Sequence, residues 1–524
     1  MAGFFDVLLR GLTLAFASVA LGGVAWTLLV LGAEAHVKPD AALRRALRTI
    51  AVGAAGAALA QTAVLLVALG ELARLGGSWP VGPFAQTLFA RAGSVRVAIG
   101  VALAIVALRL ATHPAGRAGW LALATLALGL CGSSAVLSHA VARMGDRALL
   151  LVLDAAHQLA GAVWVGGLAH LMLYRRLGEE GGRDAALVVR RFSRLALWSV
   201  ASVTVAGLAM SVLYVGDWGA VVGTGYGVMI LTKLAVLAGA LVLAWANFRA
   251  VRGQAPAAGG LRLTRYVEVE LGLGITVLFA AASLTALPPA VDVSTDRASI
   301  AEVATRLAPK LPRLTSPPVA ELIRQAEPLT ETVTRREPIE IAWSEYNHHW
   351  AGVFVLTMGL LAVLERLGVR PARHWPLVLL GLATFMFLRN DPRAWPLGPA
   401  GFWESMLLAD VLQHRLFVVV LVGFAAFEWM VRTGRLAALP WAHVFPMLCA
   451  VGGGLLLTHS HAMFNLKDEF LTELSHAPMG VLGAFAGWAR WLELRLPAGG
   501  RLPAWIWRVC FLGVGALLLV YREA

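Results

Sequence analysis

The feature that most constrains this chain is a series of apolar stretches, each about as long as a lipid bilayer is thick. A hydrocarbon core roughly 30 Å thick needs about 20 apolar residues per helix. Stretches of this kind recur along all 524 residues, of which 59% are hydrophobic and only 14% are charged. Soluble globular domains carry a much larger charged fraction. The sequence therefore predicts an integral membrane protein.

Fourteen candidate spans lie between charged or Gly/Pro-rich breaks, which predicts an all-α, polytopic membrane helix bundle. The weakest candidate is 374–389, because its apolar core of about 14 residues could be re-entrant instead. The first span lacks the basic start and the cleavage site of a signal peptide, so we expect it to remain in the protein. The spans are 11–31, 50–70, 93–112, 119–139, 148–172, 195–215, 226–247, 267–287, 347–367, 374–389, 409–430, 441–459, 475–493 and 503–521.

Basic residues predict how these spans are oriented. The net charge of +13 could indicate nucleic acid, but Lys and Arg concentrate in alternate loops between the spans. Loops of that kind face the cytoplasm. The main clusters are 38–48, 175–194, 249–265, 366–373 and 432–435. We therefore expect both termini outside, a lipid bilayer as the surroundings, and no nucleic-acid partner.

The spans fall into two blocks. Residues 1–288 contain eight spans, and residues 347–524 contain the other six. Between them, 289–346 is a polar, proline-containing stretch that the topology places outside. Its short amphipathic pieces, 298–307 and 319–326, favour either a linker or a small helical insert on the membrane surface. No sequence repeat relates the two blocks.

Histidine is concentrated on one side of the predicted membrane. Eight of the thirteen histidines lie at the outer face, and methionines occur at the same level. Imidazole and thioether together suit copper, with Cu(I) favouring sulfur and Cu(II) nitrogen. A single interfacial histidine is more often a polar anchor than a ligand. Eight histidines on one side are harder to explain in that way, and the group as a whole indicates a metal or haem site. The candidate ligands are His139, His157, His348, His349, His414, His459, His461, His476, Met463 and Met479.

One external hairpin contains three of these histidines. In THSHAMFNLKDEFLTELSHAP, residues 458–478, His459 and His461 end one span and His476 begins the next. Residues two apart on a helix point to different sides. We therefore expect His459 to pair with His476, and His461 and Met463 to act as surface capture groups. The residue that completes the site is one of His348, His349 and His414.

Ionisable residues inside the predicted spans are costly to bury and therefore informative. Asp154 and His157 lie three apart on one helix face, so the carboxylate could orient the imidazole or receive its proton. Lys233 lies within span 226–247, where ion pairing and a functional role explain it equally well. Glu270 lies near the inner start of span 267–287, which favours a structural role.

An ordered series of short motifs extends over four of these spans. It runs from HQLAGAVWVGGLAHL (157–171) through RRFSRLAL (190–197), Gly207 and TGYGVMILTKL (224–234) to Asn247, Glu270 and Pro288-Pro289. This series resembles the copper resistance protein D family of bacterial inner-membrane proteins, most clearly over 150–290. The resemblance assigns His157, Trp164, Gly166 and Gly167 to one family helix, and Tyr226, Gly227 and Lys233 to a second family segment. The glycine pair would allow a neighbouring helix to approach closely.

The resemblance implies a copper-handling protein of the bacterial inner membrane that works beside a periplasmic copper-binding protein. Outer His and Met residues would capture copper and pass it into the bundle. No P-loop or DKTG motif occurs in the sequence, so transport would be passive or coupled to a gradient, and we expect no enzymatic activity. The residues expected to line the path or shape the bundle are Asp154, Trp164, Gly166, Gly167, Tyr226, Lys233 and Glu270.

Two other functions remain open from the sequence. Two histidines on different helices at one depth could ligate haem b, which would make the protein a membrane cytochrome. The candidate pairs are His414 with His476 and His348 with His459. A copper chaperone for respiratory oxidase assembly would need the same capture residues without a path through the bundle. An optical spectrum with metal analysis separates haem from copper.

Overall fold

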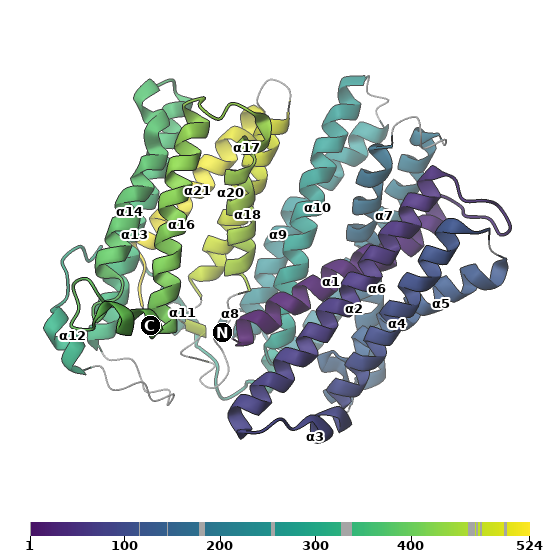
Figure 1. Ribbon diagram of the computed structural model, residues 1–524, viewed down its shortest axis with the longest axis horizontal. Helices are drawn as coiled ribbons and strands as arrows, with labels where there is room; N and C mark the ends of the chain where they lie inside the picture. The colour runs from purple at the N-terminus through teal and green to yellow at the C-terminus, as the bar shows by residue number, and fades with distance from the viewer. Residues whose placement is uncertain are drawn as a thin grey trace. The chain divides into compact units, whose positions relative to one another are not determined.

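The computed structural model consists of helices joined by turns and loops (Figure 1). It describes all residues except 1, 115, 144, 178–183, 253–256, 326–337, 459–466, 468–469, 472–473, 497–499 and 524. No strand occurs in the described part of the chain. The prediction of an all-α, polytopic membrane fold is confirmed.

The helices group into two compact units. Unit 1 comprises Met1–Thr295 with Leu457–His461, and unit 2 comprises Asp296–Leu456 with Ala462–Ala524. The change from one unit to the other at Thr295 lies inside the polar stretch 289–346. The division of the chain into a domain at 1–288, a linker or insert at 289–346 and a domain at 347–524 stays a prediction.

Eleven helices of the described chain are long and apolar enough to cross a membrane. The other three predicted spans also form helices, but these are shorter or less apolar. Helix α14 (Val378–Arg389) has 12 residues, α18 (Val444–Leu456) has 13, and α20 (His476–Arg495) has 20. Helix α14 is short because the 3₁₀ helix η5 (Arg370–Leu377) occupies the first part of 374–389. Its 12 residues rise only about 18 Å along the helix axis, which is less than the thickness of the hydrocarbon core. The count of fourteen and the outward termini stay predictions.

Unit 1 is built around its first helix. Helix α1 packs against α2, α5, α6 and α10, while α7 and α9 pack on α6 and α10 respectively. The bounds are α1 Ala2–Ala25, η1 Trp26–Val30, α2 Ala41–Gly76, α3 Val81–Gln86, α4 Leu88–Thr112, α5 Arg117–Val136, η2 His139–Ala142, α6 Arg147–Arg175, α7 Ala185–Val215, α8 Trp218–Gly223, α9 Gly225–Arg252, α10 Ala257–Ala286 and η4 Ala290–Asp292.

Helix α6 touches its neighbours through its glycine pair. A side chain at Gly166 would collide with the Ser18 carbonyl oxygen of α1, and one at Gly167 would collide with the Phe192 ring of α7. Small residues allow helix backbones to approach this closely in a membrane, where apolar burial alone does not drive association. Large apolar side chains elsewhere in the unit, such as Leu59 and Val205, remain exposed and face the lipid in a bilayer.

Unit 2 contains two tightly crossed helix pairs. Helix α13 meets α21 where Gly352 lies on the Leu519 backbone, and α18 meets α20 where Gly487 lies on the Ala450 backbone. Trp375 and Trp507 fill the core between the helices. The remaining bounds are α11 Ile300–Leu307, α12 Val319–Gln325, α13 Pro338–Arg366, α15 Phe402–Leu407, α16 Ala409–Arg432, α17 Leu439–Ala442 and α21 Arg501–Leu519.

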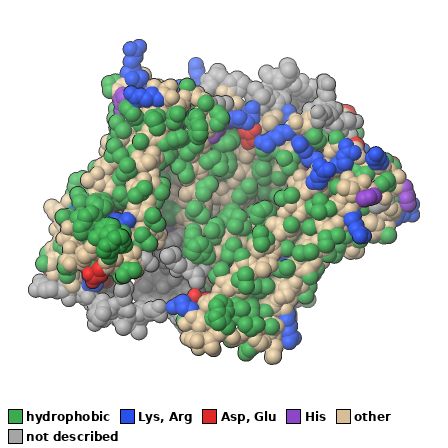
Figure 2. All heavy atoms as spheres, in the orientation of Figure 1, with side chains coloured by type: hydrophobic (Ala, Val, Ile, Leu, Met, Phe, Trp, Pro, Cys, Tyr) green, Lys and Arg blue, Asp and Glu red, His purple; other side chains and the backbone are tan. Residues whose placement is uncertain are grey.

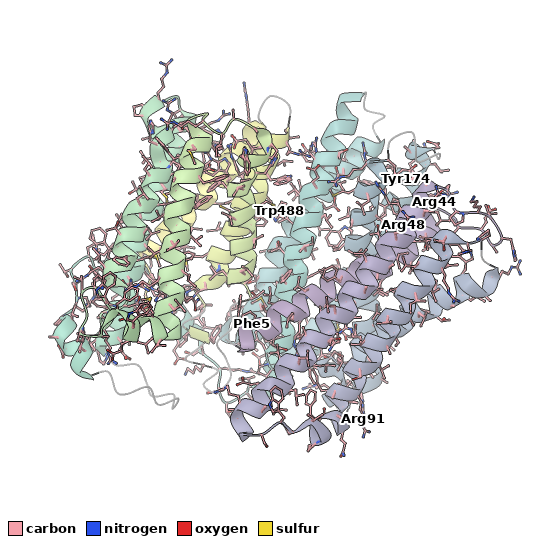
Figure 3. All side chains as sticks on the ribbon, viewed as in Figure 1. Phe5, Arg44, Arg48, Arg91, Tyr174 and Trp488 are labelled. Atoms are coloured by element: carbon pink, nitrogen blue, oxygen red, sulfur yellow. The ribbon has the colours of Figure 1, made fainter. Side chains whose placement is uncertain are left out.

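Unit 1 carries its basic residues mainly at one end. Figure 3 shows Arg44, Arg48 and Tyr174 at this end, and Phe5 and Arg91 at the opposite end. Figure 2 shows Lys and Arg side chains gathered at the same end, with apolar side chains covering the flank of the helices. Unit 1 therefore has the charge asymmetry that a positive-inside orientation requires.

Candidate functional site

His157 on α6 is held in an orientation that suits metal binding. Its Nδ1 lies 2.9 Å from the carbonyl oxygen of Val203 on α7. A carbonyl only accepts, so Nδ1 carries the proton and Nε2 retains its lone pair. No hydrogen bond reaches Nε2 from the described residues. An imidazole fixed by a backbone carbonyl through one nitrogen, with the other nitrogen available, is the usual arrangement of a metal-ligating histidine.

Gly207 makes room for this imidazole. A Cβ at position 207 would lie 3.0 Å from Cε1 of His157. Since α7 has no side chain there, the ring can lie flat enough against the helix for Nδ1 to reach the Val203 carbonyl. The absence of a side chain at Gly207 thus permits the orientation of the His157 ring.

Polar residues from three helices lie close to Asp154, which is three residues before His157 on α6. Asp154, one turn earlier on α6, accepts a hydrogen bond from Nε2 of Gln158 at 2.8 Å. Lys233 on α9 interacts electrostatically with both Asp154 and His157. The rings of Tyr214 on α7 and Tyr226 on α9 lie 6.1 Å apart, and both interact electrostatically with Asp154.

Asp154 and Lys233 bring opposite formal charges close to His157. The Asp154 carboxylate attracts the Lys233 ammonium, and it would equally attract a metal ion held by His157. Because the ammonium repels such an ion, binding is favoured when Lys233 moves away from Asp154.

Glu270 on α10 forms the second polar group of unit 1. Its Oε1 accepts a hydrogen bond from Trp164 Nε1 of α6, and its Oε2 accepts one from Asn247 Nδ2 of α9, both at 3.0 Å. Glu270 is 4% exposed and forms no ion pair with any residue of the described chain. The Oδ1 atom of Asn247 is buried and lacks a hydrogen-bond partner there. A carboxylate held by neutral donors joins three helices at this point.

His139 begins η2, between α5 and α6. Its Nε2 is buried without a hydrogen-bond partner among the residues the structure describes. Burial lowers the pKa of His139, while the nearby backbone of Thr285 opposes this effect. The imidazole is therefore neutral near pH 7, which is the form that binds metals.

In unit 2, His348 and His476 come together. His348 on α13 donates from Nδ1 to the Ser344 carbonyl at 2.9 Å and stacks on Tyr521 with ring centroids 4.0 Å apart. The His476 ring, at the start of α20, lies 6.1 Å from the His348 ring at 76°. Of the three residues predicted to complete the site with His476, His348 is the one with this ring contact.

His349 has a different environment from His348. Its Nδ1 accepts a hydrogen bond from the Arg313 backbone N–H, and its Nε2 donates to the Tyr521 carbonyl, both at 2.7 Å. The side chain is fully buried. Because both ring nitrogens are used, His349 could bind a metal only by losing one of these bonds. The arrangement favours a structural role that ties two loops to α13.

His414 lies on α16 with an oriented imidazole. Its Nδ1 lies 2.8 Å from Asp391 Oδ1, and its side chain is 36% exposed. A carboxylate behind an imidazole is a common outer-sphere arrangement in metal sites. No group of three or more His, Cys, Asp or Glu residues able to hold a metal occurs in the described chain. The metal role of His414 stays a prediction.

Three of the predicted ligands, His459, His461 and Met463, lie outside the described residues. The predicted pairing of His459 with His476, and of His348 with His459 around haem b, therefore stays a prediction. Met479 is described, and its side chain is buried one turn after His476 on α20.

A haem between His348 and His476 does not fit the side chains as they are placed. The centroids of His348, His476 and Tyr521 form a triangle with sides of 6.1, 6.2 and 4.0 Å. Tyr521 thus lies beside the axis that joins the two imidazoles, within the disc that a porphyrin ligated by both would occupy. A single metal ion avoids this conflict.

Comparison with known proteins bears on unit 1. The family described as copper resistance protein D matches residues 186–284. The predicted resemblance to this family is confirmed over these residues. The copper resistance protein D segment runs from α7 to α10 and supplies Val203, Asn247 and Glu270. Helix α6, with His157 and Trp164, lies just before it and packs against α7 and α10.

A curated relative is the copper transport protein CutJ of Bacillus subtilis (strain 168). It is 31% identical over 247 residues, which cover 44% of this chain and 44% of the relative. The chain thus matches less than half the length of that relative. No solved structure matches the chain significantly.

Some residues of these groups were not expected from the sequence. Val203 and Ser344 contribute backbone carbonyls, which any residue type supplies, so the sequence carries no signal for them. Tyr521 is the final residue of the predicted span 503–521 and belongs to no motif. Asn247 belongs to the family resemblance, but its bond to Glu270 depends on how α9 packs against α10.

Proposed function

We propose that this chain is a multi-pass protein of the bacterial inner membrane that moves copper ions from the periplasm toward the cytoplasm through unit 1. The observation that carries the proposal is His157, whose imidazole is held with Nε2 available where α6 meets the copper resistance protein D segment. The copper transport protein of Bacillus subtilis, similar over 247 residues, supports copper as the cargo.

The two polar groups of unit 1 form successive stations on this path. Trp164 lies seven residues after His157 on α6, which is about 10 Å along the helix. Copper that leaves His157 and Asp154 would next meet the carboxylate of Glu270, which no cation neutralises among the described residues. Lys233 would prevent a second ion from entering while the first is bound. Transport would be passive or coupled to a gradient, and a periplasmic copper-binding protein would deliver the ion.

Copper uptake into proteoliposomes tests this function. We expect His157→Ala to lower the initial rate by roughly tenfold, because a copper site loses a main ligand. His113→Ala is the matched control, since His113 is exposed and follows the basic end of α4. Both variants should elute as monodisperse protein in size-exclusion chromatography. An unchanged rate in His157→Ala would contradict the role of this residue.

The same preparation separates the other two functions. Intense haem absorption near one haem per chain would replace the proposal with a cytochrome. Copper binding without any uptake by the wild-type protein would favour a chaperone for oxidase assembly.

A further inference from the structure

We propose that His348 and His476 jointly bind one Cu(I) ion in unit 2, where α13 and α20 begin, with Met479 as a third donor. This site is distinct from the His157 station of unit 1. The choice of copper as the ion rests on the proposed function, whereas the pairing of the two imidazoles rests on the geometry of unit 2 alone.

The distance between the two rings fits a shared ion. Metal–imidazole nitrogen bonds are about 2 Å long, so two imidazoles on opposite sides of one ion have centroids on the order of 6 Å apart. The observed separation is 6.1 Å, with the ring planes at 76°. A tetrahedral ion would bring the centroids to about 5 Å. The wider spacing favours an ion that accepts a nearly linear pair of nitrogens.

His348 is oriented for this role. Its Nδ1 donates to the Ser344 carbonyl at 2.9 Å, so Nε2 keeps the lone pair that a metal requires. One face of the ring stacks on Tyr521 at a 19° angle. The ring is thus fixed by one hydrogen bond and one aromatic contact, and a ligand that is already ordered loses little entropy when it binds.

A buried network fixes Tyr521 in turn. Its hydroxyl accepts a hydrogen bond from Arg306 Nη2 at 3.0 Å and donates to Glu523 Oε2 at 2.9 Å. Glu523 also accepts a hydrogen bond from the Ser344 hydroxyl. Arg306 and Glu523 lie 3.9 Å apart and balance each other in charge. The network orders the site without adding a net charge that would repel a cation.

The donors select Cu(I) over Zn²⁺. Met479 lies three residues after His476 on α20, so both side chains share one helix face, and Met479 is only 5% exposed. Thioethers are soft donors that favour Cu(I). Zn²⁺ prefers four donors in a tetrahedron, and the described chain offers no third His, Cys, Asp or Glu in such a group.

Titration of the purified full-length chain with Cu(I), against a chromophoric chelator, tests the site. We expect His348→Ala and His476→Ala each to bind one Cu(I) fewer per chain than the wild type. His374→Ala is the matched control, because His374 is a histidine of the same unit that lies in η5 outside the candidate ligands, and its loss should leave the count unchanged. Equal binding by the wild type and both variants would overturn the proposal.

A second measurement begins with the wild-type chain, so its main result does not require a variant to fold. X-ray absorption at the copper edge of the wild-type chain should show imidazole scattering and a sulfur shell, and Met479→Leu should remove the sulfur shell alone. Absence of imidazole scattering, or displacement of the ion by one equivalent of Zn²⁺, would refute a Cu(I) site. If the wild-type chain binds Cu(I) through these residues but shows no copper uptake, the transport function alone is rejected. If it takes up copper but lacks this Cu(I) site, the site alone is rejected.

Discussion

At the level of single residues, the role of each histidine depends on what its two ring nitrogens contact. His157 and His348 each donate from Nδ1 to a backbone carbonyl, so Nε2 of each ring keeps its lone pair. His349, next to His348 in the chain, uses both nitrogens in hydrogen bonds. Chemically identical side chains thus divide into candidate ligands and structural residues, because their tautomers are set by neighbouring backbone groups.

Glu270→Gln tests whether the charge of this residue matters for transport. We expect the variant to fold, because the new carboxamide oxygen can accept from Trp164 and its NH₂ group can donate to Oδ1 of Asn247 once the Asn247 amide turns over. Copper uptake should fall by about tenfold, since the path loses its only inner carboxylate among these groups. Uptake measured in proteoliposomes and thermal unfolding in detergent provide the two readouts.

Glu270→Leu is the companion variant. It removes both acceptors and leaves the Trp164 and Asn247 donors buried, which should destabilise unit 1 by about 2–4 kcal/mol. If Glu270→Gln transports copper at the wild-type rate, Glu270 only joins the helices and is not a station on the path.

Residue types could be predicted as candidates from the sequence, but their partners could not. Asp154, His157 and Glu270 stand out because charged or titratable groups are rare in apolar spans. The partners of His157 and His348 are the carbonyls of Val203 and Ser344, which have no signature in a sequence. Tyr521 is brought to His348 only by the path of the chain after α21.

Among the helices, α6 carries the proposed copper ligand His157 and also packs against α1 and α7 of unit 1. Trp164 on this helix donates a hydrogen bond to Glu270, and Gly166 and Gly167, two and three residues later, lie against α1 and α7. A change in the distance between α6 and α1 would therefore move Trp164 and its partner. The contacts of Trp164 and of the glycine pair thus lie within one turn of the same helix.

Gly166→Ala should destabilise unit 1 by roughly 1–3 kcal/mol, because its methyl group would meet the Ser18 carbonyl oxygen and force α1 away from α6. Gly161→Ala on the same helix is the control, since its Cβ would meet Val203 Cγ2 at an ordinary 3.8 Å. Fluorescence-detected size-exclusion after heating measures both. Equal melting temperatures for the two variants would show that α1 and α6 can separate without cost.

Helices were predictable because an apolar run of 20 residues has few alternatives in a membrane. Each of the fourteen predicted segments contains a helix in the described chain. Five of these helices, α1, α2, α7, α10 and α13, begin nine or ten residues before the predicted span. Polar residues at helix ends explain such extensions. The apolar stretch ends at the edge of the bilayer, whereas the hydrogen-bonded helix continues into polar residues beyond it. For 374–389, Pro376 lies within η5, so the α-helix begins only at Val378.

On the scale of the whole molecule, the sequence separates two blocks and the structure divides into two units, each with its own core. Unit 1 contains the residues that match the copper resistance protein D family, whereas unit 2 contains the proposed Cu(I) pair. The content of unit 2 could not be predicted from the family resemblance, because the matched residues end at 284. Its histidines were identified by depth and side alone.

The orientation of the chain can be tested with single cysteines and a membrane-impermeant maleimide on right-side-out vesicles. We expect Gly82→Cys and Gly401→Cys to react, because both glycines have open space around them and follow outward-going spans. Lys38→Cys and Arg370→Cys should react only after permeabilisation, since they belong to basic loops that remain inside. Background labelling should be low, because Cys131 and Cys510 are buried and Cys449 is partly buried.

Labelling at positions 370 and 401 also shows whether η5 and α14 cross the bilayer. Arg370 begins η5, and Gly401 follows α14 in the chain. If the segment crosses the bilayer, Gly401→Cys reacts from outside and Arg370→Cys does not. A re-entrant segment would leave both positions on the same side, and every later span would then reverse its direction. His476, at the start of α20, would in that case face the cytoplasm, and capture of periplasmic copper by unit 2 would be excluded.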